Sequence, residues 1–212
     1  MAGATVTARG EAVAPARPDE GIWTIEVSSL DASPDQALAT VGTQSKELEA
    51  LLAELSVPTE KRSTTGVTVR EEHDWEGGRQ THRGYRAQNV VTVRLADPTI
   101  AGRLIEGSIA RAKASVRGPT WWIAPGNEAR LEACRQAAAE AKRKAEAYAD
   151  ALGLRLGDVA EIREPAGGGI EPRPLVGPIA LRAAAAPEPS LEVESGELEV
   201  KAQVDVTFHL DA

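Results

Sequence analysis

The stretch ACRQAAAEAKRKAEAYADALG, residues 133–153, decides whether the second half of the chain is a helical domain or a low-complexity linker. Apolar residues in and beside it recur at alternating spacings of three and four, which is the period of one helical face. They are Leu131, Cys134, Ala138, Ala141, Ala145, Tyr148 and Leu152. The spacing predicts a helix that is stopped by Gly153. Its small central side chains predict close packing on a sheet or another helix.

Alternating apolar and polar residues predict strands at both ends of the chain. The closing stretch GELEVKAQVDVTFHL, residues 196–210, alternates strictly, and residues 5–14 alternate more weakly. A further strand follows residues 17–21, with Trp23, Ile25 and Val27 on its inward side. Strands with a single apolar face belong to sheets that are covered on one side.

Two more helices have recognisable start signals. Ser33, Pro34 and Gln36 form a cap, a first-turn proline and a capping box, and Asp97 with Pro98 repeats the cap and proline. The first helix has an apolar stripe of Leu38, Val41, Leu48, Leu52 and Leu55, and the second has Ala101, Leu104, Ile105 and Ile109. The second helix is expected to end near Ser115.

Residues 60–95 predict a long hairpin around the stretch DWEGGRQ. Its apolar residues are odd-numbered on both arms: Val67, Val69, Tyr85, Ala87, Val91, Val93 and Leu95. If they share the buried face, the numbers of paired residues have an even sum, so the loop holds an odd number of residues. Short strands through TWWIA and near Val159–Ile162 complete an α+β fold. We expect a single domain over residues 1–212, with a flexible Pro- and Gly-rich loop at about 165–190.

Composition excludes several classes of protein. The net charge of −8 argues against a protein that neutralises duplex phosphates, so no nucleic-acid partner is expected. Cys134 is the only cysteine, so the chain has no internal disulfide. The sequence shows no signal peptide and no apolar run of about 18 residues, so we expect no membrane span and a cytoplasmic location. A periplasmic or secreted location is the alternative, if a signal peptide has been removed.

The chain resembles the SIMPL domain family of unknown function at four places in order. These are VTARGEAVAPARPDEGIWTIEV near the start, GYRAQNVVTVRL at residues 84–95, the Ala-rich helix running into ALGLRLGDVAEIRE, and the closing SGELEVKAQVDVTFHL. The resemblance implies an α+β fold, a tendency to form rings or larger oligomers, a bacterial source and links to stress tolerance. It implies no established reaction. The chain departs from the family by lacking a signal peptide and by carrying Trp121 and Trp122.

No residue pattern predicts a catalytic, metal or cofactor site. The register above places His73 and His82 on opposite faces of the hairpin, and His209 lies on the polar face of the last strand. Cys134 is expected to be a buried and inert thiol rather than a redox-active one. The basic run of Lys142, Arg143 and Lys144 is interpreted as a solvated helix face.

Trp121 and Trp122 are the candidate interface or ligand contacts. Adjacent strand residues face opposite ways, so we expect one ring in the core and the other at a subunit interface. Our leading hypothesis is a non-enzymatic, self-assembling structural or interaction module with a role in the stress response. The alternatives are a small-molecule binder that uses Trp121, Trp122 and the 165–190 loop, and a redox protein that uses Cys134.

Overall fold

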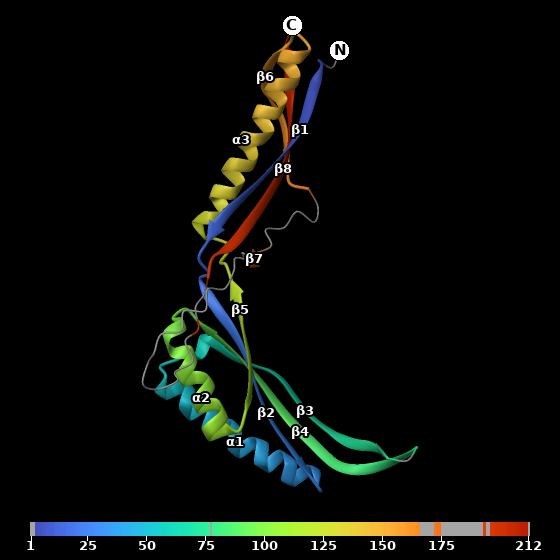
Figure 1. The fold of residues 1–212 in the computed structure, drawn as a ribbon, viewed down its shortest axis with the longest axis vertical. Coiled ribbons are helices and arrows are strands. Elements are labelled where there is room, and N and C mark those ends of the chain that lie inside the picture. The colour runs from blue at the N-terminus through green and yellow to red at the C-terminus, as the bar shows by residue number, and fades with distance from the viewer. Residues whose placement is uncertain (1–2, 77, 166–171, 175–192, 194–195, 212) are drawn as a thin grey trace, which may run out of the picture. The chain divides into compact units, whose positions relative to one another are not determined.

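The computed structural model describes residues 3–76, 78–165, 172–174, 193 and 196–211. This part of the chain has the expected α+β architecture, with three α-helices and two four-stranded antiparallel sheets (Figure 1). The chain divides into two compact units. The first takes residues 1–19, 123–181 and 196–212, and the second takes residues 20–122 and 182–195. A single domain over residues 1–212 stays a prediction, and most of the expected 165–190 loop lies outside the described residues.

In the first unit, the two ends of the chain meet in one sheet. Strand β8 (Leu198–Asp211) lies between β1 (Thr5–Ala16) and β6 (Arg155–Arg163), and the short β7 (Pro172–Pro174) also pairs with β8. Strands β1 and β8 pair without a break from Thr5 opposite His209 to Ala16 opposite Leu198. Helix α3 (Glu128–Ala151) packs on β1 and β8. The strands predicted at both ends of the chain and the long Ala-rich helix are therefore confirmed.

The face that α3 buries differs from the predicted one. Its fully buried residues are alanines at every fourth position: Ala133, Ala137, Ala141, Ala145 and Ala149. The prediction was wrong for Leu131, Tyr148 and Leu152, whose exposed fractions are 48%, 55% and 70%. The cause lies in β1, where a Cβ atom added to Gly10 would stand 1.8 Å from the carbonyl oxygen of Ala137. Backbones this close leave room only for methyl groups.

In the second unit, a sheet in the order β3-β4-β2-β5 carries two helices. The strands are β3 (Arg62–Glu76), β4 (Arg79–Leu95), β2 (Glu20–Asp31) and β5 (Ser115–Trp122). Helix α1 (Pro34–Glu54) packs on β2 and β4, and α2 (Ala101–Ala112) packs on α1 and β5. The core between these layers includes Trp23, Ile25, Val27, Leu48, Leu52, Val93 and Leu104. The inward residues predicted for β2 are confirmed.

Both predicted helix starts are present, and each side-chain cap accepts a backbone N–H. The Ser33 hydroxyl accepts from Gln36 N at 3.3 Å. The Asp97 carboxylate accepts from Thr99 N at 2.8 Å, and hydrogen bonding to Thr99 lowers the pKa of Asp97. Asp97 caps a 3₁₀ turn, η2 (Pro98–Ile100), which continues into α2. A second 3₁₀ turn, η1 (Thr59–Lys61), precedes β3. None of the described helices has the length and apolar content needed to span a membrane.

Candidate functional site

The β3–β4 hairpin of the second unit extends past the helices that cover the rest of its sheet (Figure 1). Helix α1 packs mainly on β2 and β4, so the described residues leave much of β3, an edge strand, without a cover. Val67, Val69 and Trp75 on β3 are 60%, 44% and 76% exposed. We call residues 66–76 and 79–85 the hairpin arm, and we take it as the candidate site.

The register of the arm changes at a bulge. Val67 pairs with Asn89 and Val69 with Ala87, as the predicted even sums require. Beyond Glu72, however, the pairing shifts by one residue and leaves Arg83 without an opposite partner. The hairpin therefore closes with Glu76 opposite Arg79, so the prediction of an odd loop count was wrong.

Gly84 accounts for the position of this bulge. Its φ is +140°, and an added Cβ atom would stand 2.5 Å from the carbonyl oxygen of Asp31. A side chain at this position would be strained and would also collide with the β2 backbone. The bulge thus depends on a contact with β2, outside the hairpin itself.

As a result of the bulge, the two histidines of the arm lie side by side. His73 is directly opposite His82, and their ring centroids are 5.5 Å apart in an edge-to-face arrangement. The prediction that they face opposite sides was therefore wrong. The His82 ring also lies edge-to-face with Tyr85 at 5.2 Å. Among the described residues, no three His, Cys, Asp or Glu side chains are arranged to hold a metal ion. His209 is exposed on β8, as expected.

The arm has one aromatic and aliphatic face and one ionic face. Strand alternation places Val67, Val69, His73 and Trp75 on the first. Glu71 lies on this face as well, where it accepts a hydrogen bond from the Tyr85 hydroxyl at 3.3 Å and lies 3.7 Å from His73 Nε2. On the other, Arg86 makes a two-pronged ion pair with Glu72, and Arg83 approaches Asp74 at 3.5 Å. The hydrogen bond from Arg86 lowers the pKa of Glu72. The Glu72 and Asp74 carboxylates are therefore paired with arginines of β4, whereas Trp75 on the other face stays largely exposed.

Sequence reasoning missed Trp75, although a signal for it was present. The residue stands in DWEGGRQ, two positions before the paired glycines of a hairpin turn. A side chain that close to the tip of a long hairpin lies beyond the helices that cover the sheet. A tryptophan at such a position is a candidate for contact with another molecule.

Trp121 and Trp122 end the other edge strand of the same sheet, β5, opposite Gly21 and Glu20. Both rings are partly buried, so the expectation that one of them belongs to the core was wrong. Trp122 lies under the guanidinium of Arg94, with 5.7 Å between Cζ and the ring centroid. The contact of Trp121 and Trp122 with a subunit or ligand stays a prediction.

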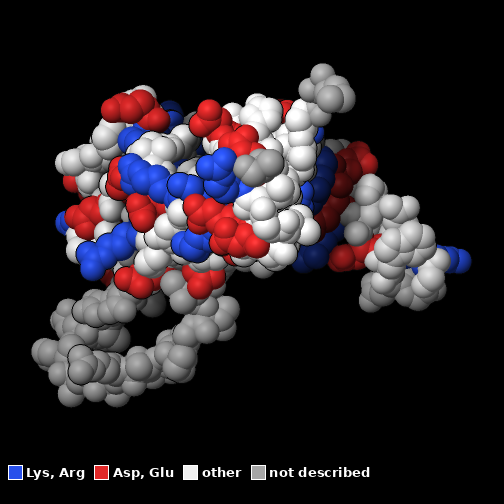
Figure 2. Space-filling view, turned by 90° about the horizontal axis from the view of Figure 1, so that it is seen from above, with Lys and Arg blue, Asp and Glu red and all other residues white. Residues whose placement is uncertain are grey.

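Cys134 and the basic run of α3 both lie on surfaces of the first unit. Cys134 is partly exposed, so the prediction of a buried thiol was wrong. The reason is that α3 buries its alanine face rather than the predicted face that includes Cys134. Lys142 pairs with Glu146 at 3.8 Å, and Lys144 pairs with Glu140 at 3.0 Å. Figure 2 shows basic and acidic side chains interspersed on the face it presents. Two of the three charges of the run are thus paired with carboxylates of the same helix.

Comparison with known proteins identifies the family. The family SIMPL, described as "Protein of unknown function (DUF541)", matches residues 6–208. The chain belongs to the SIMPL family. The resemblance based on four sequence motifs is therefore confirmed, and the α+β fold expected from it is the one observed.

Relatives of this SIMPL protein include the "Uncharacterized protein YggE" of Escherichia coli strain K12. It is 26% identical over 207 residues, which cover 90% of this chain and 83% of the relative. The YggE protein of Shigella flexneri matches to the same extent. A solved structure, a hydantoinase/carbamoylase family amidase from Burkholderia ambifaria, is 14% identical with a TM-score of 0.22, covering 56% of this chain and 29% of that one. A score this low supports no conclusion about the SIMPL fold.

Proposed function

We propose that this SIMPL protein is a non-enzymatic module that assembles with copies of itself and acts through binding. The observation that carries the proposal is the uncovered aromatic and aliphatic face of the hairpin arm, above all Trp75 with 76% of its surface exposed. Moving a large apolar side chain from water into an interface contributes about 1.5–3 kcal/mol. Trp75, Val67 and Val69 together form the central part of such an interface.

A second copy of the chain is the partner that the sheet itself suggests. The sheet ends in β3 at one edge and in β5 at the other, and both edges carry partly exposed apolar residues. A contact between the arm of one copy and the Trp121–Trp122 edge of the next would be head-to-tail. Head-to-tail contacts generate rings when the rotation closes and filaments when it does not. The oligomers implied by the SIMPL resemblance are consistent with this arrangement.

Sedimentation velocity tests the proposal across a range of protein concentrations. We expect the wild-type chain to form a stable assembly, and Trp75→Ser to weaken the contact about tenfold to hundredfold through loss of the buried ring. The matched control is Leu152→Ser, which removes a side chain of similar exposure from the end of α3 in the first unit. A monomeric wild type, or equal assembly of wild type and Trp75→Ser, would contradict the proposal.

Two alternatives and two expected properties need separate measurements. Quenching of tryptophan fluorescence by a small molecule would favour a binding protein built on Trp121 and Trp122. Oxidant-dependent activity that is lost in Cys134→Ser would favour a redox protein, and the partial exposure of this thiol is compatible with it.

The stress-related role and the cytoplasmic location stay predictions. A deletion strain under oxidative stress and cell fractionation test them.

A further inference from the structure

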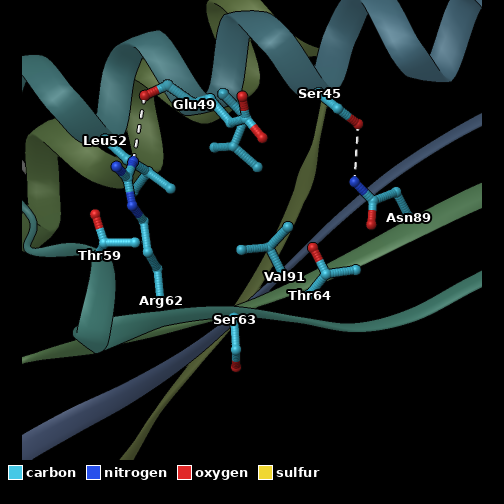
Figure 3. Close-up of a pocket in the computed structure, with 10 residues that line it drawn as sticks. Ser45, Glu49, Leu52, Thr59, Arg62, Ser63, Thr64, Asn89 and Val91 are labelled. Atoms are coloured by element: carbon cyan, nitrogen blue, oxygen red, sulfur yellow. Dashed lines mark hydrogen bonds between the residues drawn. The ribbon is translucent and has the colours of Figure 1, made fainter.

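A cleft of about 340 Å³ lies between α1 and the β3–β4 pair, within the second unit (Figure 3). Pockets for small molecules start at about 300 Å³. The cleft exists because α1 covers β2 and β4 but leaves β3 open. A bulge at Thr65 also shifts the pairing of β3 with β4 at this point. Leu48, Leu52 and Val91 line its apolar part.

At one end of the cleft, the side-chain amide of Asn89 has an unused acceptor. Asn89 Nδ2 donates to Ser45 Oγ at 2.9 Å, whereas Asn89 Oδ1 is buried and has no hydrogen-bond partner in the described part of the chain. Native proteins rarely leave a buried polar atom unpaired, and such an atom calls for an explanation. Because Ser45 Oγ accepts the bond from Asn89, its own proton remains able to donate.

At the other end of the cleft, Arg62 has an incompletely used guanidinium. Its Nη1 makes one long hydrogen bond, 3.5 Å to the backbone oxygen of Glu49, and it forms no ion pair with a described carboxylate. A guanidinium carries five N–H donors in a planar fork that matches a carboxylate. Arg62 is only partly exposed and stands at the rim of the cleft.

The two polar ends are separated by the apolar part of the cleft. Figure 3 shows Arg62 on one side and the Ser45–Asn89 pair on the other, with Val91 and Thr64 between them. A ligand that satisfies both ends therefore has an anionic group at one end and a hydroxyl at the other. The hydroxyl can donate to Asn89 Oδ1 and accept from Ser45. The Glu49 carboxylate on the same wall repels an anion in proportion to its charge, so it disfavours phosphate esters more strongly than a monocarboxylate.

We propose that this cleft binds a small monocarboxylate with an apolar chain and a hydroxyl group remote from the carboxylate. Arg62 binds the carboxylate, Leu48, Leu52 and Val91 contact the chain, and Asn89 with Ser45 binds the hydroxyl. The site does not depend on self-assembly, because every residue it uses belongs to α1, η1, β3 or β4 of one chain.

Saturation-transfer difference NMR on the full chain tests the proposal, because it detects weakly bound ligands and works equally well if the chain assembles. The probes are ω-hydroxycarboxylates from hydroxybutyrate to hydroxyoctanoate, compared with hexanoate and with hexanediol. We expect one chain length to bind best and saturably. Removing the hydroxyl or the carboxylate from that chain should raise Kd at least about tenfold. Equal binding of hydroxyhexanoate, hexanoate and hexanediol would overturn the proposal, as would no saturable binding of any hydroxycarboxylate.

Paired variants connect the binding to the cleft. Arg62→Met and Asn89→Leu should each raise the Kd of the best probe at least about tenfold, while the variants keep the wild-type circular dichroism. The controls are Arg70→Met, an exposed arginine of β3 outside the cleft, and Gln88→Leu, the neighbour of Asn89 on the opposite face of β4. The control variants should bind as the wild type does. Unchanged binding by Arg62→Met and Asn89→Leu would show that the ligand lies elsewhere and would overturn the assignment.

Discussion

Gly10 is where helix α3 comes closest to the sheet of the first unit, so Gly10→Ala tests how this unit is held together. A Cβ atom at this position would stand 1.8 Å from Ala137 O and 2.7 Å from Ala141 N. Both are backbone atoms of a helix that is buried along this face, so no side chain can rotate away. To reach an ordinary contact, the helix and strand must separate by more than about 1 Å.

The cost of that separation follows from the packing. Overpacking a core by one methyl group usually costs about 1–3 kcal/mol, and here the contact is with backbone, so we expect about 3 kcal/mol or more. Moving α3 away also loosens Ala141 and Ala145 against Ala8, Val206 and Phe208. For a chain of this size, a loss of 3 kcal/mol lowers the Tm by about 6–12 °C.

Thermal and urea unfolding followed by circular dichroism measure the effect. The matched control is Gly66→Ala in β3, where an added Cβ has nothing within 4 Å, so a change of less than about 0.5 kcal/mol is expected. Equal stability of Gly10→Ala and Gly66→Ala would refute the reasoning. It would mean that the sheet and α3 are not packed closely at this point.

Other perturbations give separate tests. Leu104→Ala empties a fully buried position of α2 and should cost about 2–5 kcal/mol, whereas Leu152→Ala should change the free energy of unfolding by less than about 0.5 kcal/mol. Ellman's reagent should label Cys134 in the folded protein, and labelling only after unfolding would contradict its partial exposure. Hydrogen bonds from Arg86 and Arg9 lower the pKa values of Glu72 and Asp205 in the folded state. The stabilisation that these two ionised carboxylates give the folded protein is therefore present above the ordinary carboxyl pKa of about 4. It is lost as the pH falls through their lower pKa values in the folded protein. The urea concentration at the unfolding midpoint should thus decrease as the pH is lowered from about 5 to about 2. An increase over this range would contradict the ion pairs.

The sequence by itself determined the elements and their order, because these depend on local signals. Strict alternation in residues 198–210 predicts a strand with one buried face, and β8 has that pattern. The caps at Ser33 and Asp97 set the starts of α1 and η2 through hydrogen bonds within three residues. Alanine's helix propensity identified α3 without knowledge of what it contacts.

Only the tertiary structure decided which surfaces these elements present. The sequence pointed α3 inward through its largest apolar residues, but the close approach of Gly10 selects the alanine face and leaves Leu131, Tyr148 and Leu152 outside. The bulge that joins His73 and His82 depends on Gly84 against the Asp31 backbone, a contact between strands far apart in the chain. Periodicity reports the local geometry of one element, whereas face and register are fixed by the distance between two backbones. That distance is set by contacts between residues far apart in the sequence.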